Sequence, residues 1–177
     1  LYFSFLYLRQ NGIKRDKMGK EIAANQLIGS YSARLDPSGR LKIPEKFRDV
    51  IEKTYGQDVF ITSLTDEAIQ IYPLSVWEEM TSVASEGALH LRPDIRKFLL
   101  RVNLKGSHHQ IDAKGRVLIN QTLREKARLN TEVEVIGLNN HLEIWNKDVL
   151  NSVIEEKPLT DEDFESIARL VPRGKTE

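Results

Sequence analysis

Arg40 and Arg116 occupy the same place in two copies of one five-residue pattern. The pattern is Asp-x-x-Gly-Arg, which reads Asp-Pro-Ser-Gly-Arg at residues 36–40 and Asp-Ala-Lys-Gly-Arg at residues 112–116. A guanidinium group that a loop presents to solvent binds phosphate oxygens in pairs and reads the edge of guanine. The two arginines are therefore candidates for contacts with a polyanion. The alternative is that each pairs with the Asp of its own motif and fixes the turn.

Three further basic residues stand close to the motifs. Lys42 follows the first motif, Lys114 lies inside the second, and Arg34 precedes the first on the incoming segment. Such a cluster suits electrostatic contacts with phosphate groups. We expect Lys42, Lys114 and Arg34 to support Arg40 and Arg116 in one binding surface.

The Asp and Gly residues of the motifs are explained by turn formation alone. Asp36 and Asp112 stand at the first position of a turn, where a carboxylate accepts backbone N–H groups, and Pro37 presets the backbone angle at the next position. Gly39 and Gly115 supply the positive φ that such a turn requires. These residues are expected to shape the turns and need not touch a ligand.

The similarity between the two copies extends well beyond the motifs. Residues 35–48 lie over residues 111–124, with the Asp, Gly and Ile and both Arg residues identical, and residues 59–72 correspond to residues 133–145. Each unit reads as strand, turn, strand, helix, strand, turn, strand over about 45 residues. A unit of that size cannot bury a sufficient core alone. The two units are therefore expected to share one core, or to pair with other chains.

Other conspicuous residues have structural explanations. Arg48 and Arg124 occupy equivalent positions in the helices predicted after the motifs. We expect each to pack over its own hairpin or to pair with an acid across an interface. Four aromatic residues fit a core better than a base-stacking surface: Tyr72, Trp77, Phe98 and Trp145.

Neither a catalytic nor a metal-binding motif is found in the sequence. It contains no HExxH pattern, no Walker-type glycine loop and no nucleophile elbow. His108, His109, Asp112 and His141 invite a metal hypothesis, but adjacent histidines on a strand point to opposite faces. The chain has no cysteine, which excludes a disulfide framework and thiolate chemistry. We therefore expect no enzyme activity, no cofactor and no metal.

The 177-residue chain is neutral overall, but its charges are unevenly placed. Residues 92–128 carry ten Lys and Arg against three Asp and Glu. Residues 51–91 carry one against seven, and residues 129–177 carry five against eleven. A local basic stretch is typical of a surface that binds a polyanion, and a solvated helix face is the other explanation.

Strands and helices can be placed around the motifs. The first motif is expected to join strands at 31–35 and 41–43 into a hairpin. Asn120 and Thr160 are predicted N-caps, and Ser75 is predicted to open a capping box that ends at Glu78. The helices are predicted over residues 45–54, 75–84, 94–102, 147–156 and 160–170.

The two ends of the sequence fall outside the repeats. Residues 1–8 are apolar and aromatic but too short to span a bilayer, which requires about 20 residues. Met18 stands shortly before the first unit, and our hypothesis is that it is the natural start, with residues 1–17 an upstream or added segment. Residues 170–174, Leu-Val-Pro-Arg-Gly, resemble a thrombin linker, and their origin stays open.

The order of these patterns resembles the MraZ family. Gly-Ser-Tyr at 29–31, the first motif and Ile-Pro-x-Lys-Phe-Arg at 43–48 are similar to the first half of that family. Tyr-Pro-Leu-Ser-x-Trp-Glu at 72–78 resembles the end of that half, and Arg-x-Phe-Leu at 96–99 resembles its linker helix. The second motif, followed by Glu-Ile-Trp at 143–145, resembles the second half.

The resemblance covers about residues 29–149 in the family's order, with two departures. Ser38 stands where a basic residue is frequent, which would weaken one phosphate contact. Asn120 stands where proline is frequent, and the fold should tolerate this. The two copies of the motif therefore need not contribute equally to binding.

The resemblance implies a mixed α+β fold, mainly β. In detail it implies a pseudo-duplicated swapped-hairpin (double-split) β-barrel of the SpoVT-AbrB type with flanking helices. The expected parts are a disordered or non-native N-terminal extension of residues 1–28, repeat 1 of residues 29–75, a helical linker of residues 76–105, repeat 2 of residues 106–149 and an acidic helical tail of residues 150–177.

The resemblance further implies a bacterial transcriptional regulator that binds double-stranded DNA. Members of the family form ring-shaped homo-oligomers and contact short direct repeats in the promoter of the division and cell-wall gene cluster. The Asp-x-x-Gly-Arg turns are their DNA-contacting elements, and they act in the cytoplasm at the nucleoid. The expected partners are thus DNA and further copies of the chain, with no membrane and no small-molecule substrate. The alternative is an oligomeric scaffold or antitoxin-like barrel that binds a protein, with the acidic tail as the partner surface.

Overall fold

A computed structural model describes residues 26–82, 84 and 89–170. The chain divides into a compact unit up to Lys147 and a second unit from Asp148 onwards, and each is described by itself. The hypothesis on Met18 concerns residues outside this description, as does that on the Leu-Val-Pro-Arg-Gly segment beyond Leu170. None of the helices described is both long and apolar enough to cross a membrane.

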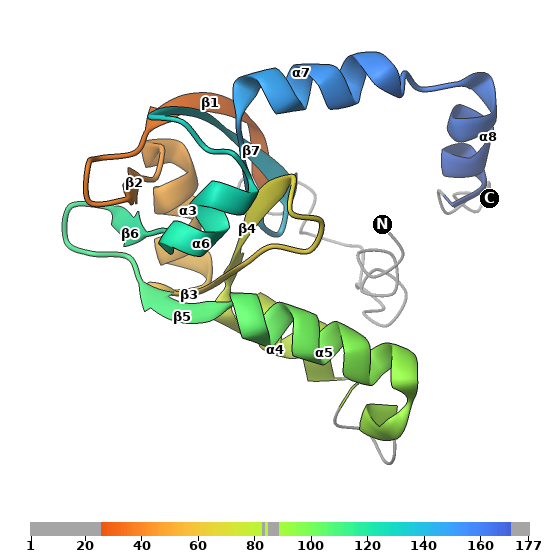
Figure 1. The fold of residues 1–177 in the computed structure, drawn as a ribbon, viewed down its shortest axis with the longest axis horizontal. Helices are drawn as coiled ribbons and strands as arrows, with labels where there is room; N and C mark the ends of the chain where they lie inside the picture. The colour runs from red at the N-terminus through yellow and green to blue at the C-terminus, as the bar shows by residue number, and fades with distance from the viewer. Residues whose placement is uncertain (1–25, 83, 85–88, 171–177) are drawn as a thin grey trace, which may run out of the picture. The chain divides into compact units, whose positions relative to one another are not determined.

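The first unit repeats one series of elements (Figure 1). Its first half contains β1 (Leu27–Arg34), β2 (Arg40–Lys42), α3 (Glu45–Thr54), β3 (Asp58–Thr62) and β4 (Ala68–Pro73). Its second half contains β5 (Ser107–Gln110), β6 (Arg116–Leu118), α6 (Gln121–Lys126), β7 (Glu132–Asn139) and β8 (Leu142–Trp145). Between the halves lie α4 (Leu74–Ser82), the 3₁₀ helix η2 (Leu89–Leu91) and α5 (Pro93–Lys105). The order of strands and helix predicted for each half is confirmed.

The two halves exchange strands. In the larger sheet the order is β1-β7-β8-β4-β3-β5, and every neighbouring pair is antiparallel. β1 of the first half therefore pairs with β7 of the second half, and β5 of the second half pairs with β3 of the first. β2 and β6 form a small sheet of their own. The fold is mixed α+β and mainly antiparallel sheet, and the hydrogen-bonded order of the larger sheet ends at β1 and at β5.

The hairpin expected around the first motif is split. The N–H of Asp36 donates to the carbonyl of Arg40 at 2.9 Å, and one isolated bridge joins Leu35 to Leu41. Beyond that bridge β1 continues along β7 and β2 along β6, so the two strands of the expected hairpin pair only beside the turn. The exchange places Leu41 opposite Val117, and both side chains are buried between the halves.

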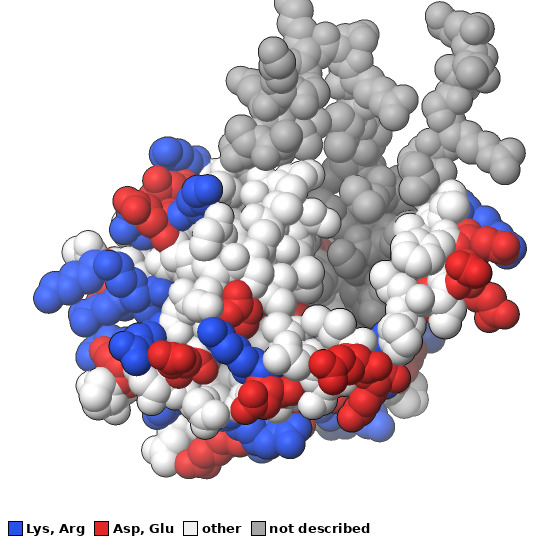
Figure 2. All heavy atoms as spheres, turned by 90° about the horizontal axis from the view of Figure 1, so that it is seen from above, with Lys and Arg blue, Asp and Glu red and all other residues white. Residues whose placement is uncertain are grey.

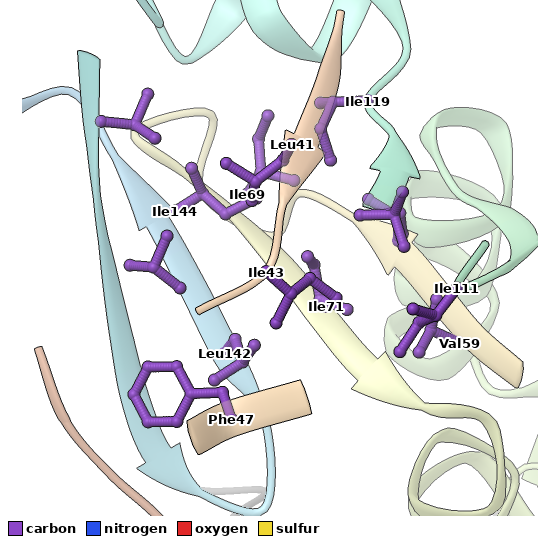
Figure 3. Close-up of a cluster of buried hydrophobic side chains, with 14 of the residues drawn as sticks. Leu41, Ile43, Phe47, Val59, Ile69, Ile71, Ile111, Ile119, Leu142 and Ile144 are labelled. Carbon is purple, nitrogen blue, oxygen red and sulfur yellow. The ribbon is translucent and has the colours of Figure 1, made fainter. Parts of the chain in front are cut away.

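One apolar core lies between the two halves (Figure 3). Ten of its side chains, none more than 2% exposed, come from both halves: Leu41, Ile43, Phe47, Val59, Ile69, Ile71, Ile111, Ile119, Leu142 and Ile144. Burial of a side chain of this size contributes about 1.5–3 kcal/mol relative to leaving it exposed. The expectation of one shared core is confirmed, because residues of both halves belong to this one cluster.

A second apolar cluster joins α4 and α5 to the sheet. Phe60, Tyr72 and Trp77 are buried in it, and the Phe60 and Trp77 rings stack with centroids 4.3 Å apart. All six residues of β4 are buried, because the core covers one face of the strand and this cluster covers the other. Trp145 is also buried, and Phe98 packs against the cluster, so the prediction of core aromatics is confirmed.

Two of the three predicted helix caps are present. The Oδ1 of Asn120 accepts the N–H of Thr122 at 2.8 Å, which caps α6. The hydroxyl of Thr160 accepts the N–H of Asp163 at 3.3 Å before α8 (Asp161–Leu170), which follows α7 (Lys147–Glu156) in the chain. The capping box at Ser75 is wrong: β4 leads directly into α4 at Leu74, so Ser75 lies inside the helix.

His141 makes the stability of the fold depend on pH. Its ring stacks on Tyr72 with centroids 4.5 Å apart, and burial lowers the pKa of His141. Below about pH 6.5, the ordinary histidine pKa, the unfolded chain takes up a proton that the folded chain does not. We therefore expect the free energy of unfolding to fall as the pH drops below that value, and His141→Asn to reduce this fall.

Urea unfolding between about pH 5 and pH 8 measures this effect. His109, whose pKa is also lowered by burial, should leave a residual slope in the His141→Asn variant. His90 is exposed, and His90→Asn serves as the control substitution. A His141→Asn variant with the full slope of the parent chain would contradict the prediction.

Candidate nucleic-acid interface

The first motif forms a tight turn around its aspartate. The Oδ1 of Asp36 accepts the backbone N–H of Ser38 at 2.9 Å and that of Arg40 at 2.8 Å. The N–H of Gly39 donates to the carbonyl of Asp36 at 2.8 Å, and Gly39 has a φ of +80°. A left-handed φ at this position favours glycine because it has no Cβ.

The second motif forms the same turn. The Oδ1 of Asp112 accepts the N–H of Lys114 at 2.8 Å and that of Arg116 at 2.9 Å. The N–H of Gly115 donates to the carbonyl of Asp112 at 2.8 Å, and Gly115 has a φ of +72°. The backbone therefore gives Arg40 and Arg116 equivalent starting points.

Pairing of β2 with β6 brings the two turns together. Lys42 lies opposite Arg116 in this pair, and Arg40 lies opposite Leu118. Each returning strand then bonds to the glycine of the other turn: one N–H, that of Ile43, donates to the Gly115 carbonyl at 3.0 Å. In the second half, the N–H of Ile119 donates to the Gly39 carbonyl at 2.9 Å. In Figure 1 both turns lie at the same end of the first unit.

The side chains of Arg48 and Arg124 each lie against the turn of the other half. A methyl carbon added at Gly39 would lie 2.7 Å from the Cζ of Arg124, and one added at Gly115 would lie 2.9 Å from the Cδ of Arg48. Each helix arginine therefore covers the glycine of the other half's turn, and the expected packing over its own hairpin is wrong. The cause is the β2–β6 pair, because the helix that follows each strand is placed beside the opposite turn.

Gly39→Ala tests this close approach. The left-handed φ alone costs an alanine about 1–2 kcal/mol. At Gly39 the Arg124 guanidinium must also move and give up its hydrogen bond to the Ile119 carbonyl, for which we expect a further loss of about 0.5–1.5 kcal/mol. Gly56→Ala is the matched control, because Gly56 has a φ of +88° but no atom within 4 Å of the added carbon. Urea unfolding gives both free energies, and equal losses at the two glycines would contradict the contact.

The side chains of Arg40 and Arg116 differ although their turns are alike. Arg116 donates to the Oδ2 of Asp112 from Nε at 2.9 Å and from Nη2 at 2.8 Å, and its side chain is 30% exposed. This pair holds the pKa of Asp112 below its ordinary value. Arg40 is exposed, and within the described part of the chain its side chain has neither a hydrogen bond nor an ion pair. Pairing with the motif's own Asp thus occurs in the second turn and not in the first.

The other predicted basic residues lie on the same unit. Lys42 and Lys114 are exposed beside their turns. Arg34 forms an exposed ion pair with Glu132 at 3.0 Å, so part of its charge is offset. Figure 2 shows Lys and Arg side chains gathered at the left end of the molecule, where the two turns lie in Figure 1.

The histidines have separate surroundings. The Nε2 of His108 lies 2.7 Å from the Oδ1 of Asp58, and that of His109 lies 2.7 Å from the hydroxyl of Ser107. The first contact joins β5 to β3, and the second lies within β5. Across residues 26–82, 84 and 89–170, no three His, Asp or Glu side chains are grouped so as to hold a metal ion.

Comparison with known proteins places this arrangement in a family. The model of a family described as the antitoxin-like MraZ protein matches residues 104–169. The chain is 38% identical over 140 residues to the transcriptional regulator MraZ of Acidobacterium capsulatum, and the match covers 79% of this chain and 95% of that protein. The chain belongs to the MraZ family.

Further members of the MraZ family match over a similar extent. The transcriptional regulator MraZ of Finegoldia magna is 36% identical, with 77% of this chain and 92% of that protein covered. The protein of the same name from Koribacter versatilis is 35% identical, with 80% of this chain and 97% of that protein covered. The resemblance to the MraZ family read from the two motifs is therefore confirmed.

Proposed function

We propose that this chain is a transcriptional regulator that binds double-stranded DNA through its two Asp-x-x-Gly-Arg turns. The observation that carries the proposal is the meeting of both turns at one end of a shared core, with an exposed Arg40 on the first. The names of the relatives support it, because they describe transcriptional regulators and not enzymes. No cofactor and no small-molecule substrate is part of the proposal.

In this mechanism the arginines of the turns are the principal DNA contacts. Arg40 and Arg116 reach a groove or its phosphates, and a guanidinium in the major groove selects guanine. The remaining basic residues, Lys42, Lys114 and Arg34, neutralise phosphates and release counterions, so binding weakens as salt rises. The aspartates and glycines shape the turns without touching DNA: Asp36, Asp112, Gly39 and Gly115.

The proposal includes assembly of several copies. A ring-shaped homo-oligomer would present many turns along a series of short direct repeats in the promoter of the division and cell-wall gene cluster. Contacts that are weak singly then add through high effective concentration. We propose that the strand exchange between residues 29–75 and 106–149 corresponds to a swapped-hairpin barrel of the SpoVT-AbrB type. The chain would act in the cytoplasm at the nucleoid, with the segment 76–105 as linker and residues 150–177 as a tail.

A gel-shift experiment tests the proposal. The full chain is titrated onto a labelled fragment from upstream of its own gene, at near-physiological salt and with excess unrelated DNA, and its mass in solution is measured. We expect binding that resists the competitor, and a protected series of direct repeats in a footprint. Binding that the competitor abolishes would contradict the proposal and favour the alternative, a scaffold or antitoxin-like protein that uses its acidic tail to bind another protein.

A further inference from the structure

The arginine that covers the second turn is surrounded by acids. The guanidinium of Arg48 lies 3.0 Å from Asp49, 3.6 Å from Glu45 and 3.9 Å from Glu52. All three belong to α3 and lie within about one helical turn of Arg48. The positive charge over Gly115 is therefore accompanied by three carboxylates.

The arginine that covers the first turn has different neighbours. Gln121 and Arg128 stand in the second half where Glu45 and Glu52 stand in the first. The remaining acid of α6, Glu125, accepts the side-chain N–H of Gln121 at 2.8 Å. The Nε of Arg124 donates to a backbone carbonyl, that of Ile119, at 3.1 Å. Within the described residues, Arg124 forms no ion pair with a carboxylate.

Each helix arginine lies over the turn of the other half. The acids around Arg48 therefore lie at the second turn, and the surroundings of Arg124, without an ion pair, lie at the first. Arg124 lies over Gly39, next to the exposed Arg40 and on the turn from which Lys42 follows. Among the described residues, the three cations of the first turn have no carboxylate partner, and the Asp36 carboxylate accepts two backbone N–H groups. On the second turn Arg116 pairs with Asp112 and Arg48 with three acids, so within the described part of the chain Lys114 is the cation of this turn without an ion pair.

We propose that the first turn is the principal phosphate-binding site, formed by Arg40, Lys42 and Arg124, and that the second turn binds the DNA backbone more weakly. Arg124 comes from the second half, so the site is built from both repeats. A phosphate that approaches Arg116 must compete with the Asp112 carboxylate, whereas one that approaches Arg40 displaces only water. The proposal rests on the DNA-binding function proposed above and divides that function unequally between the two turns.

Two charge-matched variants compare the turns. Asp36→Asn with Arg40→Gln, and Asp112→Asn with Arg116→Gln, each leave the net charge unchanged and retain a side-chain oxygen that accepts the turn's N–H groups. Dissociation constants for the upstream DNA fragment are measured by fluorescence anisotropy over a range of salt concentrations. For the first variant we expect about a tenfold loss of affinity for DNA, with the salt slope of binding reduced by about 1 per contacted turn. For the second variant we expect less than about a threefold loss of affinity. Equal losses, or a larger loss for the second, would overturn the proposal.

A second pair of variants tests the contribution of Arg124. Arg124→Gln should weaken binding and reduce the salt slope, Arg124→Lys should restore most of the slope, and Arg48→Gln should stay within about twofold of the parent chain. If Arg124→Gln does not fold, Gln121→Glu brings a carboxylate to Arg124 as Glu45 does for Arg48. Asn103→Asp adds the same charge on α5 as its control.

The outcomes separate this inference from the function on which it rests. A parent chain without salt-dependent binding to DNA would refute the proposed function itself. A parent chain that binds, with Arg124→Gln or Gln121→Glu no weaker than its control, would overturn only the assignment of the principal site to the first turn.

Discussion

Replacing both Arg40 and Arg116 by Gln is expected to weaken binding to the upstream DNA fragment about 30-fold at near-physiological salt. A good bidentate contact from an arginine to a base changes affinity by roughly 10- to 100-fold. Most of the loss should come from Arg40, whose side chain is exposed and has no partner among the described residues. In an oligomer each lost contact recurs in every copy that touches DNA. Titration of labelled DNA by fluorescence anisotropy measures the change.

The control for this variant removes the same charge elsewhere. Arg92 and Arg96 are exposed residues at the start of α5, and Arg92→Gln with Arg96→Gln lowers the net charge by the same two units. We expect this control to bind within about threefold of the parent chain. If it lost as much affinity as the double variant of the turns, overall charge and not the turns would be responsible for binding.

Leu41→Ala is expected to lower the free energy of unfolding by about 2–5 kcal/mol, the range found for truncation of a buried leucine. Leu41 is fully buried and lies opposite Val117 in the β2–β6 pair, at the contact between the two halves. Since single domains unfold with only about 5–15 kcal/mol, this one change removes a large part of the total. Urea unfolding measures it.

The neighbouring residue provides the control for stability. Lys42 is exposed on the same strand, and Lys42→Ala should change the free energy of unfolding by less than about 0.5 kcal/mol. The slope of the unfolding free energy with urea should stay constant in both variants. A Leu41→Ala variant as stable as Lys42→Ala would mean that β2 and β6 do not pack together as the structure places them.

Local features of the fold could be predicted from the sequence. The α3 helix at Glu45–Thr54 and the caps at Asn120 and Thr160 follow from residue type and apolar spacing over a few positions. The exchange of strands could not be predicted in this way. Alternation shows that Leu41 faces inward, but it faces inward whether β2 pairs with β1 or with β6. Only the packing of the whole unit selects between these partners.

For the candidate site too, the residue types could be predicted from the sequence but their contacts could not. The sequence identified both motif arginines, but the motif is alike in its two copies and does not reveal that Arg116 pairs with Asp112 while Arg40 does not. The replacement of Glu45 by Gln121 at the equivalent position is visible in the sequence. Its effect on the charge of the first turn follows only from the position of Arg124 over that turn, which is a consequence of the strand exchange.

The pairing of β2 with β6 has a consequence for how this molecule changes over evolutionary time. Two identical chains that met in this way would form a symmetric dimer, and every substitution in their gene would appear on both faces. Here the two halves lie in one polypeptide, so a single codon alters one face and leaves its counterpart as it was. Covalent linkage thus removes the symmetry constraint, and one turn is free to specialise while the other preserves the architecture.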